Sequence, residues 1–220
     1  MPVNFKEKQL RKSQKIKKRD KITPSKNTLH MALGFKDNRI SKAMRYAKNF
    51  VGVKYKVNKD APTKDGAPFW VSNDPPPNFE DIKKKGGMCC VGLPNLIRRY
   101  LGLQVPGLVT GQKKHVFPGG TGAWFEYLKL KKRLKKIDYN KSYPKGTLLL
   151  EDYNPINMGH LAIVWTENKK GLLHSKILHS RYEPGIKSIV IEYFHNYMFE
   201  DKINKRFTHI CLPKDWLLKN

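Results

Sequence analysis

Cysteine is scarce in this chain. Its 220 residues include three cysteines, Cys89, Cys90 and Cys211, an odd number far below what a disulfide framework requires. The chain has no Cys-x-x-Cys pair, and its seven histidines are scattered along it, so the spacing does not indicate a zinc site. We therefore expect no metal and no cofactor, and we expect Cys211 to be a small buried hydrophobic residue.

Long apolar runs are also absent. No window of the sequence approaches the roughly 18–20 apolar residues that a transmembrane helix needs, and residues 1–6 are not followed by the apolar core of a signal peptide. We expect no transmembrane segment, no cleaved secretion signal and an intracellular, reducing location, either the cytoplasm or a virion. A hydrophobic content of 39% is nevertheless sufficient for one globular domain with tails or inserts.

Acidic residues are few compared with basic ones. The chain carries 18 Asp and Glu against 44 Lys and Arg, a formal net charge of +26. Ten basic and two acidic residues fall within residues 1–27, which predicts a disordered basic arm there and a folded domain over residues 28–220. The arm and the basic domain suggest nucleic acid or another polyanion as a partner, contacted through phosphates rather than bases. Solubility alone, or a lysine-rich composition set by the genome, is the alternative explanation of the domain's charge.

The periodicity of the chain predicts helices followed by strands. We expect helices over residues 38–51, 90–101 and 123–137, and a Pro-rich insert over residues 58–87. Five strands are then expected, over residues 147–150, 160–166, 172–180, 188–194 and 208–212. This order predicts an α+β fold in which N-terminal helices pack on a mainly antiparallel sheet.

Cys90 and His160 are the candidate reactive residues. A helix start lowers the pKa of a thiol placed there, and Cys90 begins a predicted helix. An imidazole can accept the proton of such a thiol, and His160 begins a predicted strand. Alternation places His160, Ala162 and Val164 on one face of that strand, and these small residues would let the Cys90 helix pack over it. The alternative is that Cys90 and His160 are buried structural residues.

A third polar group is expected to orient the imidazole of His160. The next predicted strand offers two candidates, His174 and His179. Helical spacing likewise does not separate Cys90 from Cys89, because both cysteines align with Leu93.

Five short segments carry a family resemblance. They are, in order, Gly52–Tyr55, Cys89–Leu93, Gly146–Leu148, Gly159–Ile163 and Leu178–Ser180. They resemble the Gly-x-x-Tyr turn, the Asp-Cys-Ser-Gly-Leu nucleophile motif and three strand motifs of the NlpC-type cell-wall peptidases, which are papain-like cysteine hydrolases. The resemblance runs through most of residues 40–216 and implies a papain-like fold of the NlpC type. The chain is most similar to divergent members without leaders, such as those of large DNA viruses.

The resemblance implies roles for four residues. Cys90 would be the nucleophile and His160 the base. His179, rather than His174, would fix the tautomer of the base. Tyr55 would line the substrate cleft near the thiol.

The nucleophile segment also departs from the family motif. Cys89 and Val91 replace the family's Asp and Ser. Pro94 predicts a helix that starts late or is distorted, because a proline inside a helix clashes with the carbonyl four residues before it, here that of Cys90. The insert of residues 58–87 would reshape the substrate cleft.

The sequence thus predicts a thiol-dependent hydrolase that cleaves an amide bond through a thioester, with Cys90, His160 and His179 as a Cys-His-His triad. The substrate class would be a peptide, a protein or a lipid-linked amide. One alternative is a thiol acyltransferase that uses the same residues. The other is a basic nucleic-acid-binding or packaging protein on an inactive hydrolase fold.

Overall fold

The computed structural model describes residues 38–56, 79–84, 86–106, 119–151, 159–183, 185–196 and 207–218. These residues belong to one compact unit, residues 35–220. The arm predicted over residues 1–27 lies outside the described residues, as does most of the insert predicted over residues 58–87. Within the described part of the chain, no helix has the length and apolar character needed to cross a bilayer.

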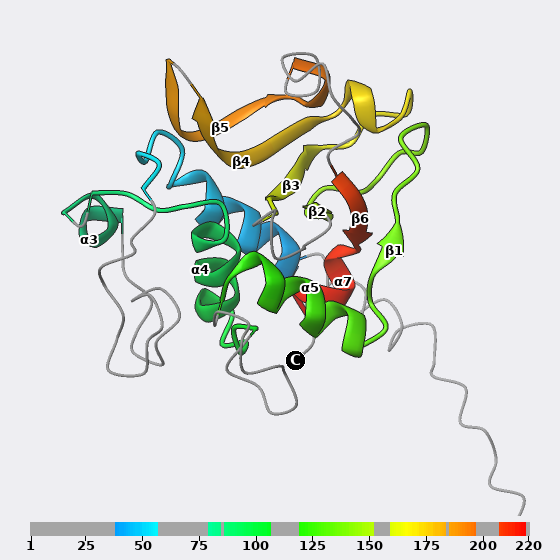
Figure 1. Ribbon diagram of the computed structural model, residues 1–220, viewed down its shortest axis with the longest axis horizontal. Coiled ribbons are helices and arrows are strands. Elements are labelled where there is room, and N and C mark those ends of the chain that lie inside the picture. The colour runs from blue at the N-terminus through cyan, green and yellow to red at the C-terminus, as the bar shows by residue number, and fades with distance from the viewer. Residues whose placement is uncertain are drawn as a thin grey trace, which may run out of the picture. The chain divides into compact units, whose positions relative to one another are not determined.

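The expected α+β class is confirmed, because helices pack on an antiparallel sheet that has six strands in the described residues (Figure 1). The strands are β1 (Lys135–Lys136), β2 (Leu148–Glu151), β3 (Leu161–Thr166), β4 (Lys176–Glu183), β5 (Ile186–Tyr193) and β6 (Phe207–Cys211). Their spatial order is β1-β6-β2-β3-β4-β5. All five expected strands are present with shifted ends, and the one expected over residues 172–180 begins as the 3₁₀ turn η2 (Leu172–His174).

Three helices of the described residues correspond to expected ones, with shifted ends: residues 38–48, α4 (Gly92–Tyr100) and α5 (Thr121–Leu130). The helices α3 (Phe79–Lys84) and α7 (Pro213–Trp216) and the helical residues 194–196 are not among those expected. The prediction of a helix continuing to residue 137 is wrong. Lys132 adopts the left-handed conformation at φ 54, which stops α5. Lys135 and Lys136 then form β1 and pair with β6.

The helix α4 begins late, as Pro94 predicts. It starts at Gly92, and the Asn95 N–H donates to the Val91 carbonyl at 3.1 Å. Pro94 therefore lies in the first turn, where a backbone N–H has no acceptor inside the helix. The expected start at Cys90 is wrong by two residues, so both neighbouring cysteines precede the helix.

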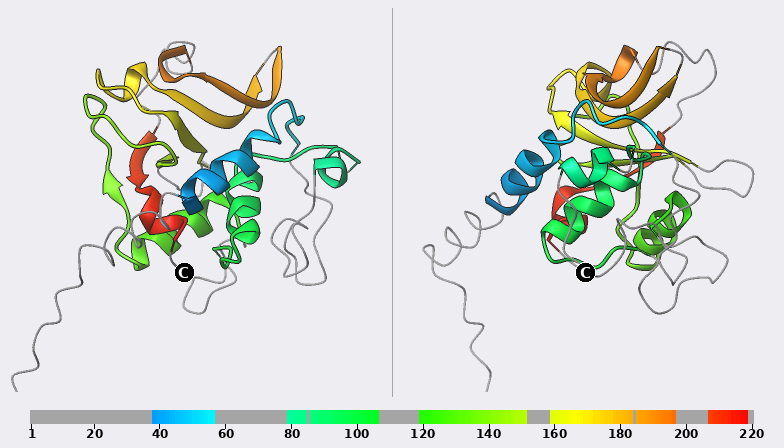
Figure 2. Two further views of the ribbon diagram at one scale, coloured as in Figure 1. Left: turned by 180° about the vertical axis from the view of Figure 1, so that it is seen from behind. Right: turned by 90° about the vertical axis from the view of Figure 1, so that its left-hand side faces the viewer.

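Two cores lie on opposite faces of the sheet. The larger core contains Leu161 and Ile163 of β3 together with Leu96 of α4, and the smaller core contains Ala162 and Val164. The expectation that the cysteine helix covers the face of Ala162 and Val164 is therefore wrong. It covers the bulkier Leu161 and Ile163, whose burial removes more apolar surface from water. Figure 2 shows α4 and the helix of residues 38–48 on the same side of the sheet.

Candidate active site

Antiparallel pairing of β3 with β4 brings His160 and His179 into contact. His160 directly precedes β3, and the register places Ala162 opposite His179. The ring Nε2 of His160 lies 3.0 Å from Nδ1 of His179, with the ring planes at 81°. Both histidines are buried, so the hydrogen bond between the imidazoles is largely shielded from water.

His174, the other histidine offered by the sequence, lies outside this contact. It belongs to η2 and is exposed. Its backbone carbonyl accepts a hydrogen bond from the Asn168 side chain at 3.0 Å. The structure therefore brings His179, and not His174, to His160.

Glu192 and Arg181 extend the contact, and the sequence analysis did not identify them. His179 Nε2 lies 2.6 Å from Oε1 of Glu192. Arg181 Nη1 donates to the other carboxylate oxygen, Oε2, at 2.7 Å. The β4–β5 register places Glu192 opposite Ile177, which makes it a diagonal neighbour of His179 on the same face. Only the register of this hairpin, and no motif, would have identified Glu192.

Gly87 lets residues 87–90, here called the cysteine segment, lie against residues 54–56. The Met88 N–H donates to the Lys54 carbonyl at 3.0 Å, and the Lys56 N–H donates to the Met88 carbonyl at 3.3 Å. Gly87 has a φ of +122°, and a Cβ there would lie 2.1 Å from the Lys54 carbonyl oxygen. Only glycine fits this close approach.

Two further hydrogen bonds fix the cysteine segment to the strands that carry the histidines. The Ser180 hydroxyl of β4 donates to the Met88 carbonyl at 3.1 Å. The Leu161 N–H of β3 donates to the Cys90 sulfur. Ser180 and Leu161 each directly follow one of the two paired histidines. The same backbone that positions the imidazoles therefore positions the thiols.

The hydrogen bond between the adjacent thiols separates their pKa values. The Cys90 thiol donates to the Cys89 sulfur, which lowers the pKa of Cys89, and the N–H groups at the start of α4 lower it further. The same bond and burial raise the pKa of Cys90 well above its ordinary value, against the opposing effect of the Leu161 N–H. The Cys90 thiol and the N–H groups before α4 thus lower the pKa of Cys89. The Val91 N–H at the helix start also acts to lower the pKa of Cys90, as expected, but the bond with Cys89 and burial outweigh it.

Tyr55, predicted to line the cleft, lies in the segment that borders Met88. Its N–H donates to the Lys187 carbonyl of β5 at 2.8 Å. Its ring contacts that of Tyr182, with centroids 5.0 Å apart. Because Tyr182 is 64% exposed, this aromatic pair lies at the surface of the β4–β5 hairpin.

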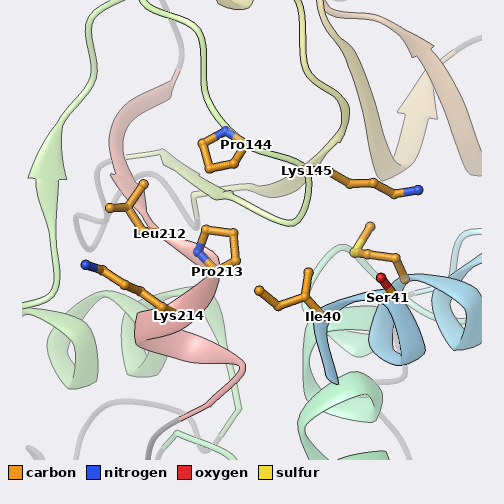
Figure 3. Close-up of a pocket in the computed structure, with 8 residues that line it drawn as sticks. Ile40, Ser41, Pro144, Lys145, Leu212, Pro213 and Lys214 are labelled. Atoms are coloured by element: carbon orange, nitrogen blue, oxygen red, sulfur yellow. The ribbon is translucent and has the colours of Figure 1, made fainter. Parts of the chain in front are cut away.

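A pocket of about 590 Å³ lies elsewhere in the domain (Figure 3). It is lined by Ile40, Ser41, Met44, Pro144, Lys145, Leu212, Pro213 and Lys214. None of these residues belongs to the predicted site. The Lys145 ammonium lies over the Trp165 ring, 4.4 Å from its centroid.

Among the described residues, no group of three or more His, Cys, Asp or Glu side chains is arranged to hold a metal ion.

No protein-family model and no curated protein matches the chain. The function therefore has to follow from the geometry and chemistry of the site. That site combines a thiol pair before α4, a buried imidazole pair and a carboxylate held by an arginine.

Proposed function

We propose that the protein is a thiol-dependent hydrolase of amide bonds, built on a papain-like fold of the NlpC type. A cysteine two residues before a helix, a histidine directly before a strand and a second histidine on the neighbouring strand support the proposal. The NlpC family takes its nucleophile, base and orienting residue from these places. The antiparallel sheet of the α+β domain is compatible with that fold.

The contact of His160 Nε2 with His179 Nδ1 at 3.0 Å is the observation that carries the proposal. With Nε2 engaged by His179, the ring nitrogen of His160 able to accept a thiol proton is Nδ1. The Leu161 N–H, one residue further along, donates to the Cys90 sulfur. The proposal requires the Cys90 thiol, which packs with the Leu161 face of β3, to reach the His160 ring at the start of that strand, since a nucleophile needs its base within hydrogen-bond reach.

In the proposed reaction, His160 takes the proton of the Cys90 thiol, and the thiolate attacks the carbonyl carbon of the amide. Backbone N–H groups around Cys90 stabilise the oxyanion that forms. The imidazolium of His160 then gives its proton to the leaving amine, and a thioester remains on Cys90. Water, deprotonated by His160, hydrolyses the thioester and restores the thiol.

Cys90 is assigned as the nucleophile, and Cys89 is assigned a supporting role. The N–H groups of Val91 and Gly92 lower the pKa of Cys89, and the Gly92 N–H donates to the Cys89 carbonyl at 3.0 Å. Cys89 stands where the family has Asp, another acceptor. The raised pKa of Cys90 means that a base has to remove its proton, which is the role proposed for His160.

An activated acyl donor, p-nitrophenyl acetate, tests the proposal without knowledge of the natural substrate. We expect acetylation of Cys90, located by peptide mass mapping, followed by return of the free thiol in water. Cys90→Ala should abolish this acetylation, and Cys89→Ala should retain it. Because Cys89 accepts the hydrogen bond that raises the pKa of Cys90, Cys89→Ala should also speed acetylation at neutral pH.

The unfolded protein gives the reference rate for a thiol without a base. Acetylation of Cys89 first, or equal and slow acetylation of Cys89, Cys90 and Cys211, would contradict the assignment. Return of the thiol only after an amine acceptor is added would indicate the acyltransferase instead.

A further inference from the structure

A buried ion pair lies beside the imidazole pair and takes no part in the steps proposed above. The side chains of Arg181 and Glu192 are 4% and 13% exposed, and Arg181 Nη1 donates to Glu192 Oε2 at 2.7 Å. Moving each ion out of water costs several kcal/mol, so a contribution to stability does not by itself explain why this ion pair is buried. The second carboxylate oxygen lies 2.6 Å from Nε2 of the fully buried His179 side chain.

The chemistry of these groups determines which ring nitrogens carry protons. A carboxylate only accepts hydrogen bonds, so His179 has to donate from Nε2 to Glu192. In a neutral imidazole the other nitrogen is then an acceptor, so His179 Nδ1 accepts from His160 Nε2. His160 therefore carries its proton on Nε2, and its Nδ1 is unprotonated.

We propose that Glu192, oriented by Arg181, is the positioning residue that sets the tautomers of His179 and His160. The inference rests on the proposed function, because only His160 with an unprotonated Nδ1 can take the thiol proton while Nε2 remains bonded to His179. When His160 becomes an imidazolium, the chain of hydrogen bonds also links its charge to the carboxylate. Glu192 acts through His179 rather than on the reacting atoms.

Arg181 selects the carboxylate oxygen that meets the ring. It lies two residues after His179 in β4, on the same face, and the register places it opposite Ser188 of β5. Because Arg181 engages Oε2, Oε1 is the oxygen that faces His179. A guanidinium only donates, so this arrangement requires an acceptor on the side of Arg181.

Glu192→Gln tests the inference, because it keeps the shape of the side chain and changes the direction of its hydrogen bonds. Arg181 still requires an acceptor, so the new amide presents its oxygen to Arg181 and its NH₂ group to His179. His179 then has to accept at Nε2 and donate from Nδ1, and both rings change tautomer. Long-range ¹H–¹⁵N NMR spectra of the ¹⁵N-histidine-labelled protein, assigned with single His→Gln variants, report this directly.

We expect both rings to be protonated at Nε2 in the wild-type protein and at Nδ1 in Glu192→Gln. Acetylation of Cys90 should fall about 100-fold in the variant, the size of a general-base contribution. Glu167→Gln is the matched control, since Glu167 is an exposed carboxylate that accepts from the Ser142 hydroxyl at 2.9 Å. It should change neither the spectra nor the rate.

A wild-type His160 protonated at Nδ1, or unchanged tautomers in Glu192→Gln, would overturn the inference. The wild-type spectrum decides the first point even if the variant does not fold. The expected tautomers could also be found, and reversed in the variant, in a protein that never acetylates Cys90. That result would support the tautomer assignment and overturn the proposed hydrolase.

Discussion

The two ends of α4 are held by different kinds of hydrogen bond. Near the C-terminal end, the fully buried Arg98 donates to the carbonyls of Gln104 and Trp216, each at 2.5 Å. Just before the N-terminal end, the sulfurs of Cys89 and Cys90 accept from backbone N–H groups. Carbonyl acceptors have no proton to lose, whereas thiols and imidazoles change protonation near neutral pH.

This difference shows how one helix can serve both stability and reactivity. The C-terminal end belongs to a polar network in which the Trp124 indole also donates to Asn95 at 2.7 Å. Burial lowers the pKa of Arg98, but its hydrogen bonds do not depend on a choice of tautomer. Substitutions near the C-terminal end should therefore alter the free energy of unfolding, and those near the thiols should alter their rates of reaction.

Arg98→Met should produce the largest effect on stability. It removes the guanidinium that donates to the carbonyls of Gln104 and Trp216, at a cost of about 1–3 kcal/mol for each hydrogen bond lost. We expect the free energy of unfolding to fall by about 2–4 kcal/mol, measured by urea denaturation. Under native conditions the rate of Cys90 acetylation should stay within about twofold of wild type, because Arg98 bonds to Gln104 and Trp216, whereas Cys90 bonds to Cys89 and Leu161.

Arg99→Met is the matched control for this substitution. Arg99 follows Arg98 in α4 but is only half-buried, so its loss should cost less than about 1 kcal/mol. Equal destabilisation by the two variants would mean that Arg98 does not hold this end of the helix.

His160→Gln should slow the reaction of Cys90 strongly and change the free energy of unfolding less. The side-chain amide can still donate to His179 Nδ1, which lies 3.0 Å from the ring Nε2 of His160, but it cannot take a proton from a thiol. We expect acetylation of Cys90 at neutral pH to slow about 10-fold or more, with a loss of stability below about 2 kcal/mol. The measurements are nitrophenolate release and urea denaturation.

His174→Gln provides the matched control, since His174 is exposed and lies outside the imidazole pair. It should leave both measurements unchanged. If His160→Gln acetylates Cys90 as fast as wild type, His160 is not the base.

Local sequence signals predict the class of the fold and most of its strands. The apolar runs that contain Leu148, Leu161 and Ile189 become β2, β3 and β5, because such residues favour a pleated, half-buried surface. Lys135 and Lys136 carry no such signal. They form β1 only because they pair with β6, which comes much later in the chain.

The candidate site is predictable only where it depends on motifs. Motif order singles out His160 and His179, which the strand pairing brings together. Glu192 lies beside His179 because of the register of the β4–β5 hairpin, and this register depends on the turn between the strands. The lowered pKa of Cys89 depends first on its hydrogen bond with the Cys90 thiol, and residue spacing does not report that contact.

Cys211 should give the smallest of the predicted effects, and its pKa shift is opposite in direction to that of Cys89 before α4. Burial raises the pKa of this core cysteine from its usual 9.0 to about 12. Between these values the unfolded chain loses the thiol proton and the folded chain keeps it, so Cys211 stabilises the fold fully below about pH 9 and progressively less above it. We expect the difference in unfolding free energy between wild type and Cys211→Ala to shrink by about 1 kcal/mol from about pH 8.5 to about pH 10. Urea denaturation of both proteins at each pH cancels the titration of groups that they share. A constant difference would mean that Cys211 ionises as readily in the folded protein as in the unfolded chain, and the contrast between the cysteines would then be lost.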